Sequence, residues 1–341
     1  MRFSRTFSIR MRKRRLLLFP VLALLLLLAA AAALCLGTVC VSPKELLEIL
    51  LGRDTASVAA RIVRFSRLPR LAAALLAGSA LAVSGAIIQS VLANPLAAPN
   101  IIGVNAGAGL AVTLCCAFLP AALRLQSLAA FLGAFVAVLL IFSLSQRAGA
   151  SRMTLVLAGV IVSAVCNAAT DLIVTFVPDA LTGYSDFRIG GLNGVSFQRL
   201  FPAACLILPA LLLACTLPHE LDVLNLGAET ASGLGMRVGA TRTLLLAIAA
   251  VLAGAAVSFA GLLGFVGLIV PHVVRMLVGG ENRFVIPTSM LGGAILLTLC
   301  DLAGRTVFAP YELPVGILLA FLGGPFFLWL LLRRRGGHGN D

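Results

Sequence analysis

The sequence is poor in charge, since only 11% of its 341 residues are Asp, Glu, Lys or Arg, against about a quarter in an average soluble domain. Lysine is nearly absent, because Lys13 and Lys44 are the only two. Neither follows a glycine, so no GxxxxGKS/T phosphate-binding loop exists. Histidine occurs three times, and no HExxH, GxSxG or CxxC motif is present. The sequence therefore predicts no catalytic site, no resident metal or cofactor, and no ATP site of its own.

Apolar residues dominate instead, at 60% of the chain. A helix needs about 20 apolar residues to cross a bilayer, and the chain offers such runs repeatedly. We expect an all-α polytopic membrane protein with about ten transmembrane helices. The expected spans cover about residues 16–40, 68–92, 99–119, 125–145, 153–177, 198–217, 242–262, 264–278, 284–303 and 314–332. We expect Pro271 to break the eighth span, and residues 178–197 to form an external Gly-rich loop.

The basic residues predict the orientation. Seven Lys or Arg fall within residues 1–15, which places the N-terminus in the cytoplasm. We expect a cytoplasmic N-terminus at 1–15, one transmembrane domain at 16–335 and a cytoplasmic tail at 336–341, in the cytoplasmic (inner) membrane. The net charge of +13 does not predict nucleic-acid binding, because the basic residues are dispersed at span ends without interleaved aromatics. The lipid bilayer is the expected partner of these charges.

Two polar interruptions separate apolar spans on the cytoplasmic side. Asn94-Pro95-Leu96-Ala97 ends the second span, because the residue before a proline avoids the helical region. This segment is either a simple turn or a constriction where two copies meet, and periodicity does not separate the two. Residues 218–241 form the longer interruption, which Gly227 and Gly235 divide into two short helical pieces. Asp222 and Glu229 lie near the starts of these pieces, where acidic residues favour helix.

Polar side chains also lie inside the fifth span, at Ser163, Asn167, Thr170 and Asp171. Intramembrane polar residues normally face protein or water, so this stripe serves helix packing or lines a translocation pathway. The pathway is favoured, because an unpaired Asp facing lipid is too costly.

Arginine recurs at every third residue before the second span, and these residues are Arg61, Arg64, Arg67 and Arg70. If the segment is helical, they share one side of it. They either anchor the chain at the membrane surface or dock an acidic partner outside. In the ninth span, Asp301 and Arg305 stand four residues apart and are expected to pair.

Five motifs together resemble the FecCD family, the permease subunits of ABC importers for iron–siderophores, haem and vitamin B12. They are RLPR through NAGAGL at 67–110, LNLGAETASGLGMRV at 224–238, GLLGFVGLIVPHVVRMLVG at 261–279, CDLAGR at 300–305 and ELPVGILLAFLGGPFFLWLL at 312–331. The resemblance implies a type II ABC importer permease architecture. It also implies a homodimer or related heterodimer, two copies of an ATP-binding subunit and an extracytoplasmic substrate-binding protein.

The resemblance also implies roles for particular residues. The binding protein would dock on Arg67, Arg70 and Arg305. The ATP-binding subunit would seat the coupling segment 219–237, with Asp222, Leu226, Gly227, Glu229, Leu234 and Gly235. The cytoplasmic gates would include Asn94, Leu96 and Ser151, while Asn167 and Asp171 line the pathway.

The expected function is transport of a ferric siderophore, haem or corrinoid, driven by a separate ATPase, so the chain itself is not expected to be an enzyme. The alternative is an ion- or proton-coupled secondary transporter, for which Asp171 is the one plausible midplane charge. A membrane-embedded enzyme is a more distant alternative, because no catalytic constellation is present.

Overall fold

The computed structural model describes residues 2–37, 39–120, 122–149 and 151–335. Throughout these ranges the regular structure is helical, without a strand. Seven helices are long and apolar enough to cross a membrane, and three shorter apolar helices accompany them. Together they match the ten predicted spans, so the predicted fold class is confirmed. The predicted tail at 336–341 lies outside the described residues.

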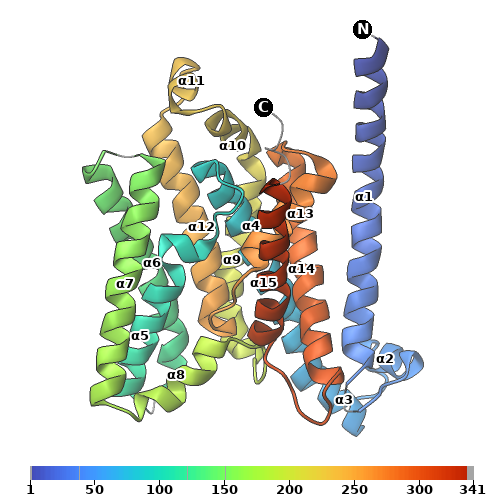
Figure 1. Cartoon of the computed structure of the whole chain (residues 1–341). Helices are drawn as coiled ribbons and strands as arrows, with labels where there is room; N and C mark the ends of the chain where they lie inside the picture. The colour runs from blue at the N-terminus through green and yellow to red at the C-terminus, as the bar shows by residue number, and fades with distance from the viewer. Residues whose placement is uncertain (1, 38, 121, 150, 336–341) are drawn as a thin grey trace.

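The spanning helices form an upright bundle (Figure 1). They are α1 (Arg2–Cys35), α4 (Leu68–Leu92), α5 (Val104–Phe118), α6 (Leu123–Arg147), α7 (Arg152–Phe176), α9 (Phe197–Thr216), α12 (Val238–Ala260), α13 (Val266–Val278), α14 (Asn282–Thr306) and α15 (Val315–Arg335). Short helices cover the bundle ends, and these are α2 (Pro43–Leu50), α3 (Val58–Ile62), α8 (Ala180–Ile189), α10 (Pro218–Asn225) and α11 (Ala228–Gly233).

The two ends of the bundle differ in the short helices they carry. One end holds α10 and α11 together with the start of α1, and we call it the α10 end (Figure 1). The opposite end holds α2, α3 and α8, and we call it the α2 end. Helix α1 has 34 residues. It is about 51 Å long at 1.5 Å per residue, so it continues past the bundle at the α10 end.

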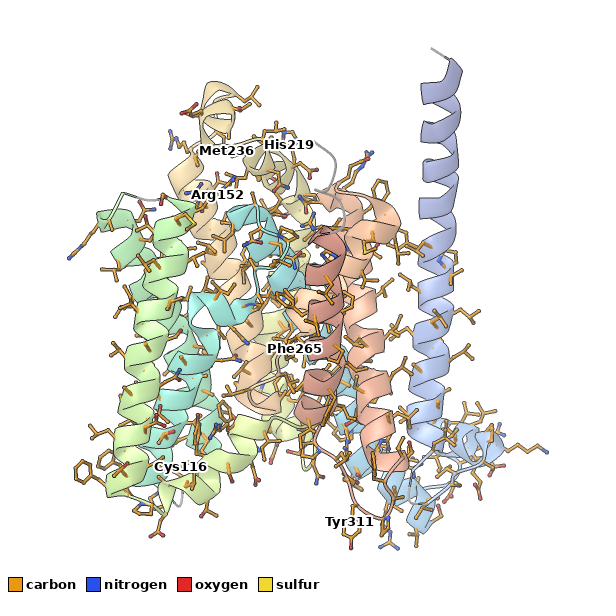
Figure 2. All side chains as sticks on the ribbon, in the orientation of Figure 1. Cys116, Arg152, His219, Met236, Phe265 and Tyr311 are labelled. Carbon is orange, nitrogen blue, oxygen red and sulfur yellow. The ribbon has the colours of Figure 1, made fainter. Side chains whose placement is uncertain are left out.

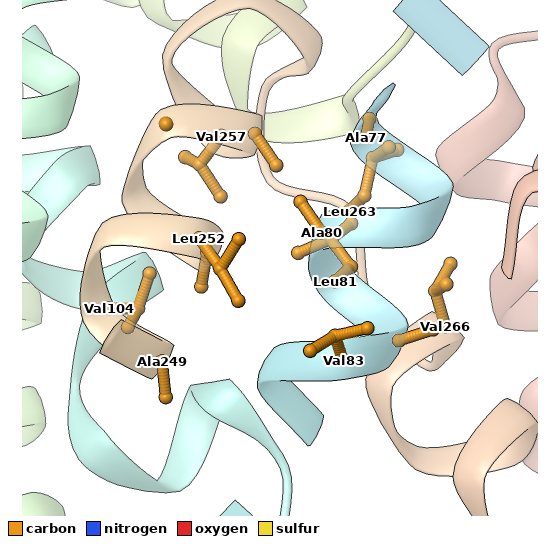
Figure 3. Close-up of a cluster of buried hydrophobic side chains, with 14 of the residues drawn as sticks. Ala77, Ala80, Leu81, Val83, Val104, Ala249, Leu252, Val257, Leu263 and Val266 are labelled. Atoms are coloured by element: carbon orange, nitrogen blue, oxygen red, sulfur yellow. The ribbon is translucent and has the colours of Figure 1, made fainter. Parts of the chain in front are cut away.

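Helix α4 is the centre of the fold, and it packs against α12, α13 and α14. Its side chains are small, which brings the neighbouring helices close (Figure 3). A Cβ on Gly78 would lie 2.2 Å from the carbonyl oxygen of Gly293 on α14. Gly107 of α5 and Gly133 of α6 approach in the same way, with 2.4 Å between a Cβ on Gly107 and the Gly133 oxygen. Small residues at helix contacts are what lipid-embedded packing requires, because lipid provides no hydrophobic force between helices.

Two local predictions are wrong. The segment 178–197 is not merely a loop, because residues 180–189 form α8. This helix lies across the α2 end, where Leu262 N–H donates to the Phe187 oxygen at 2.9 Å and Tyr184 packs over Gly109 of α5. These tertiary contacts hold α8 against the bundle.

Pro271 also does not break the eighth span, because α13 runs through it from Val266 to Val278. The proline removes the partner of the Gly267 carbonyl, which instead lies against Gly85 of α4, with 1.8 Å to an ideal Cβ there. The chain turns before α13 instead, where Gly261 and Phe265 have φ values of +72° and +65°.

Candidate translocation and coupling site

The segment predicted to couple to an ATPase extends beyond the bundle as α10 and α11 (Figure 1). Gly227 separates the two helices with φ of +106°, and Gly235 follows α11 with φ of +86°, both left-handed conformations that favour glycine. Leu226 and Leu234 are 62% and 66% exposed at these bends, and Glu229 is exposed in the first turn of α11. A partner that covered this polar protrusion would bury both leucines.

Asp222 of α10 faces inward and joins four helices through a hydrogen-bond network. Its Oδ1 accepts from the backbone N–H and the Nδ2 of Asn282, at 3.0 and 2.7 Å. Asn282 begins α14 and is fully buried. The Asn282 Oδ1 accepts from Ser90 Oγ of α4 at 3.1 Å and from Arg275 Nη2 of α13 at 3.3 Å. Arg275 Nη2 also donates to Ser90 Oγ at 2.8 Å and to the Ala86 carbonyl at 3.3 Å.

The sequence prediction included Asp222 and missed its partners Ser90, Arg275 and Asn282. A polar residue at the end of each of three apolar spans was the only available signal. Such residues are common at membrane interfaces, so only the folded structure shows that these three meet.

The first predicted gate is the turn after α4. Ala93 has φ of +45° and ends the helix, and Asn94 Oδ1 then accepts the Leu96 N–H at 3.0 Å. The second predicted gate residue, Ser151, caps α7, because its Oγ accepts the Thr154 N–H at 3.0 Å. Both segments lie at the α10 end, because α4 ends there and α7 begins there (Figure 1).

A cavity of about 420 Å³ lies between the start of α7 and the junction of α10 with α11. Ser151 and Arg152 line one wall, and Leu226 and Gly227 line the other. Arg152 Nη2 donates to the Leu224 carbonyl of α10 at 3.1 Å, so the predicted coupling segment also contacts the residue next to the second predicted gate residue, Ser151. Figure 2 shows Arg152 and Met236 at this end, whereas Tyr311 lies at the other end.

The two predicted pathway residues lie on the outer surface of the chain. Asn167 and Asp171 are exposed on α7, whereas Thr170 between them is buried and donates to the Cys166 carbonyl at 2.9 Å. Among the described residues, the Asp171 carboxylate has no hydrogen-bond or ion-pair partner. A carboxylate on a spanning helix needs water or a protein partner, so another chain or an aqueous path is expected to cover this face.

The three arginines predicted to dock a binding protein are buried rather than displayed. Arg67, Arg70 and Arg305 are 4%, 8% and 6% exposed. Arg70 pairs with Asp301 and with Glu312, each at 2.8 Å. The predicted pairing of Asp301 with Arg305 is present at 3.4 Å. The expectation that these side chains face outward is corrected by their contacts, and their role in docking stays a prediction.

Arg67 and Arg305 cap the end of α1. The last carbonyls of a helix lack intrahelical partners and carry partial negative charge. Arg67 Nη1 donates to the Leu34 and Cys35 carbonyls at 2.5 and 3.1 Å, and Arg305 Nη2 donates to the Ala33 carbonyl at 2.5 Å. These bonds join α1, α4 and α14 at the α2 end. Arg61 is exposed while Arg67 is buried, and the π-helical turn Val63–Arg67 lies between α3 and α4.

Comparison with known families identifies the architecture. Residues 24–333 match the FecCD transport family. The chain belongs to this family. Its members are transport permeases, which agrees with the spanning helices described above.

Individual relatives agree with this family. The chain is 42% identical to the hemin transport system permease protein of Yersinia pestis over 276 residues, covering 79% of this chain and 82% of that protein. It is 34% identical to an Fe(3+)-citrate import system permease protein of Bacillus subtilis, covering 95% and 97% of the two chains. A solved chain of a metal-chelate type ABC transporter in an inward-facing conformation aligns with a TM-score of 0.82 at 29% identity, covering 92% of this chain and 97% of that one.

Proposed function

We propose that this FecCD-family chain is the translocation subunit of a binding-protein-dependent ABC importer, working as a pair of permease chains on two ATP-binding subunits. The observation that carries the proposal is the protruding coupling segment. Its leucines Leu226 and Leu234 are exposed, while Asp222 and Arg152 tie the same segment to both predicted gates. A surface for a partner is thus connected to the ends of α4 and α7.

A second permease chain would complete the pathway. The face of α7 with Asn167 and Asp171 is exposed, and contact of the Asp171 carboxylate with lipid would be energetically costly. Two copies facing each other across this surface would enclose a polar path. ATP-driven movement of residues 219–237 would then rock α7 and α15, and open the path alternately on the two sides. The α10 end is the cytoplasmic side in this arrangement, with both termini in the cytoplasm.

The proposed cargo is an iron chelate such as a ferric siderophore, or haem or a corrinoid. The support is the set of relatives, which are named for hemin, Fe(3+)-citrate and achromobactin transport. An extracytoplasmic binding protein would deliver the cargo at the α2 end.

Affinity purification of the tagged chain in mild detergent tests the proposal. We expect an ATP-binding subunit and a binding protein to co-purify, and the complex in liposomes to take up hemin or ferric citrate only with ATP. Uptake that survives ATP depletion but stops without a proton gradient would instead identify a secondary transporter. A matched control uses the complex with non-hydrolysable ATP.

A further inference from the structure

The hydrogen-bond network around Asn282 fixes the orientation of the Asn282 side-chain amide. Asp222 and Arg275 carry opposite charges at the same end of the bundle, and the Asn282 amide lies between them. Its Nδ2 donates to the Asp222 carboxylate at 2.7 Å, while its Oδ1 accepts from Arg275 at 3.3 Å. Both partners favour the same orientation of the amide, because an inverted amide would place an acceptor against Asp222 and a donor against Arg275.

The network ends on the last turn of α4. Arg275 donates to the Ala86 carbonyl, and both Arg275 and Asn282 bond the Ser90 hydroxyl. In the adjacent position, Gln89 Nε2 donates to the Leu268 carbonyl of α13 at 3.4 Å. Hydrogen bonds with α13 and α14 therefore hold the last two turns of α4 at three residues.

The gate turn is bonded to the same residues. The Ser90 carbonyl accepts the Ala93 N–H at 3.1 Å, and the Gln89 carbonyl accepts the Asn94 N–H at 3.0 Å. A displacement of α10 is thus connected to Asn94 through Asp222, Asn282 and Ser90. The two side-chain links, from Asp222 to Asn282 and from Asn282 to Ser90, are half-buried and buried, so water competes with them weakly.

We propose that Asn282 and Arg275 are positioning residues that transmit movement of α10 to the Asn94–Leu96 gate. The proposal rests on the proposed function, since it assumes that an ATPase moves α10. It assigns the span-eight arginine and the first residue of α14 a role in coupling rather than in cargo binding. Asn282 is central to this connection, because its side chain bonds Asp222, Arg275 and Ser90.

Asn282→Asp isolates the link to α10. The new carboxylate still accepts from Arg275 and Ser90, but it lies against the Asp222 carboxylate and repels it, so that the backbone N–H of residue 282 is the remaining donor to Asp222. Adding Asp222→Asn restores a donor–acceptor pair with the charges exchanged. Arg283→Gln is the matched control, because it makes the same change in net charge at the next residue, an exposed side chain paired with Glu281. Ser90→Ala is a second, uncharged variant that weakens the link to α4.

The measurement is the thiol-labelling rate of a Leu96→Cys variant in the complex with its ATP-binding subunit, in liposomes. The exposed Cys40, Cys205 and Cys215 are first replaced by serine. Labelling with a maleimide is compared without nucleotide and with ATP plus vanadate, while ATP hydrolysis is followed in parallel. No transported ligand is needed for this readout.

In the parent and in Arg283→Gln we expect nucleotide to change the labelling rate about tenfold, within the usual range of coupling between linked sites. Asn282→Asp should lose this response while it still hydrolyses ATP, Ser90→Ala should reduce it, and the Asp222→Asn/Asn282→Asp pair should regain most of it. A full response in Asn282→Asp would overturn the proposal. The proposal would also be overturned if both Asn282→Asp and the Asp222→Asn/Asn282→Asp pair lost the ATP-binding subunit. Asn282 would then be needed only for assembly with that subunit. If nucleotide left the labelling rate of the Leu96→Cys variant itself unchanged, the proposed function would be overturned as well.

Discussion

Asp301 is a buried carboxylate between two buried arginines at the α2 end. Its side chain is 4% exposed and lies 2.8 Å from Arg70 and 3.4 Å from Arg305. A buried ion pair adds little net stability, but removal of one partner leaves a buried charge without compensation. The ion pairs of Asp301 with Arg70 and Arg305 therefore add little net stability, but replacing any one of these residues is costly.

Arg70→Met should lower the free energy of unfolding by about 3–5 kcal/mol, because it leaves the Asp301 charge with only the longer contact to Arg305. Thermal unfolding of the purified chain in detergent measures the effect. The control is Glu312→Gln, whose side chain is 37% exposed. That change should cost less than about 1 kcal/mol, as for other exposed pairs. Equal losses in both variants would show that burial does not set the strength of these contacts.

The arginines also mark the limit of prediction at this scale. Their spacing predicted one shared face, which would either anchor the chain at the membrane surface or dock an acidic partner outside. Arg67 and Arg305 are instead bonded to carbonyls of α1, more than 30 residues away from Arg67 in the sequence. Helical spacing carries no information about which distant helix end needs a cap, so this burial could not be predicted.

At the scale of elements, close approach of helices depends on paired glycines. A Cβ on Gly78 would lie 2.2 Å from a backbone oxygen, whereas one on Gly324 would meet open space. Gly78→Ala should therefore destabilise the chain by about 1–3 kcal/mol through overpacking. Gly324→Ala should be neutral or stabilising, because alanine favours helix over glycine. Melting temperatures of the two variants in one detergent decide this, and a lower value for Gly324→Ala alone would contradict the packing account.

The coupling segment makes a second prediction at this scale. Leu226 and Leu234 are exposed, so replacing both with serine should leave thermal unfolding unchanged. The affinity for the ATP-binding subunit should fall by more than about tenfold, because each of the two truncated anchors costs more than about 1 kcal/mol and 1.4 kcal/mol is tenfold. Co-purification yield is the measurement, and Leu50→Ser, an exposed leucine at the opposite end, is the control. Normal retention would remove these leucines from the interface.

Most of the elements could be predicted, because a bilayer demands long apolar helices and proline or glycine marks their ends. Span 68–92 matches α4 at both ends. Helix α8 was missed because its support comes from α5 and from residues 261–262 rather than from its own sequence. The network at Asn282 was missed for the same reason, since its members come from four separate helices.

At the scale of the whole molecule, the burial of three arginines changes where a binding protein is expected to dock. Arg53 and Arg61 remain exposed at the α2 end. Charge reversal of both should slow association of an acidic binding protein by about tenfold at low salt, with a smaller effect at high salt. Reversal of Arg67 and Arg305 should instead destabilise the chain, because it removes the caps of α1. Surface plasmon resonance at two salt concentrations separates these outcomes, and unchanged association in the Arg53/Arg61 variant would exclude this surface.

In the proposed mechanism, another subunit moves the protruding segment α10–α11, and this movement passes to the pathway. Uptake of radiolabelled iron, offered as ferric citrate or hemin, into liposomes that hold the chain alone or its complex tests it most directly. We predict uptake only when the ATP-binding subunit, the binding protein and ATP are all present, and none when Leu226 and Leu234 are replaced. Uptake by the chain alone, without nucleotide, would contradict the account.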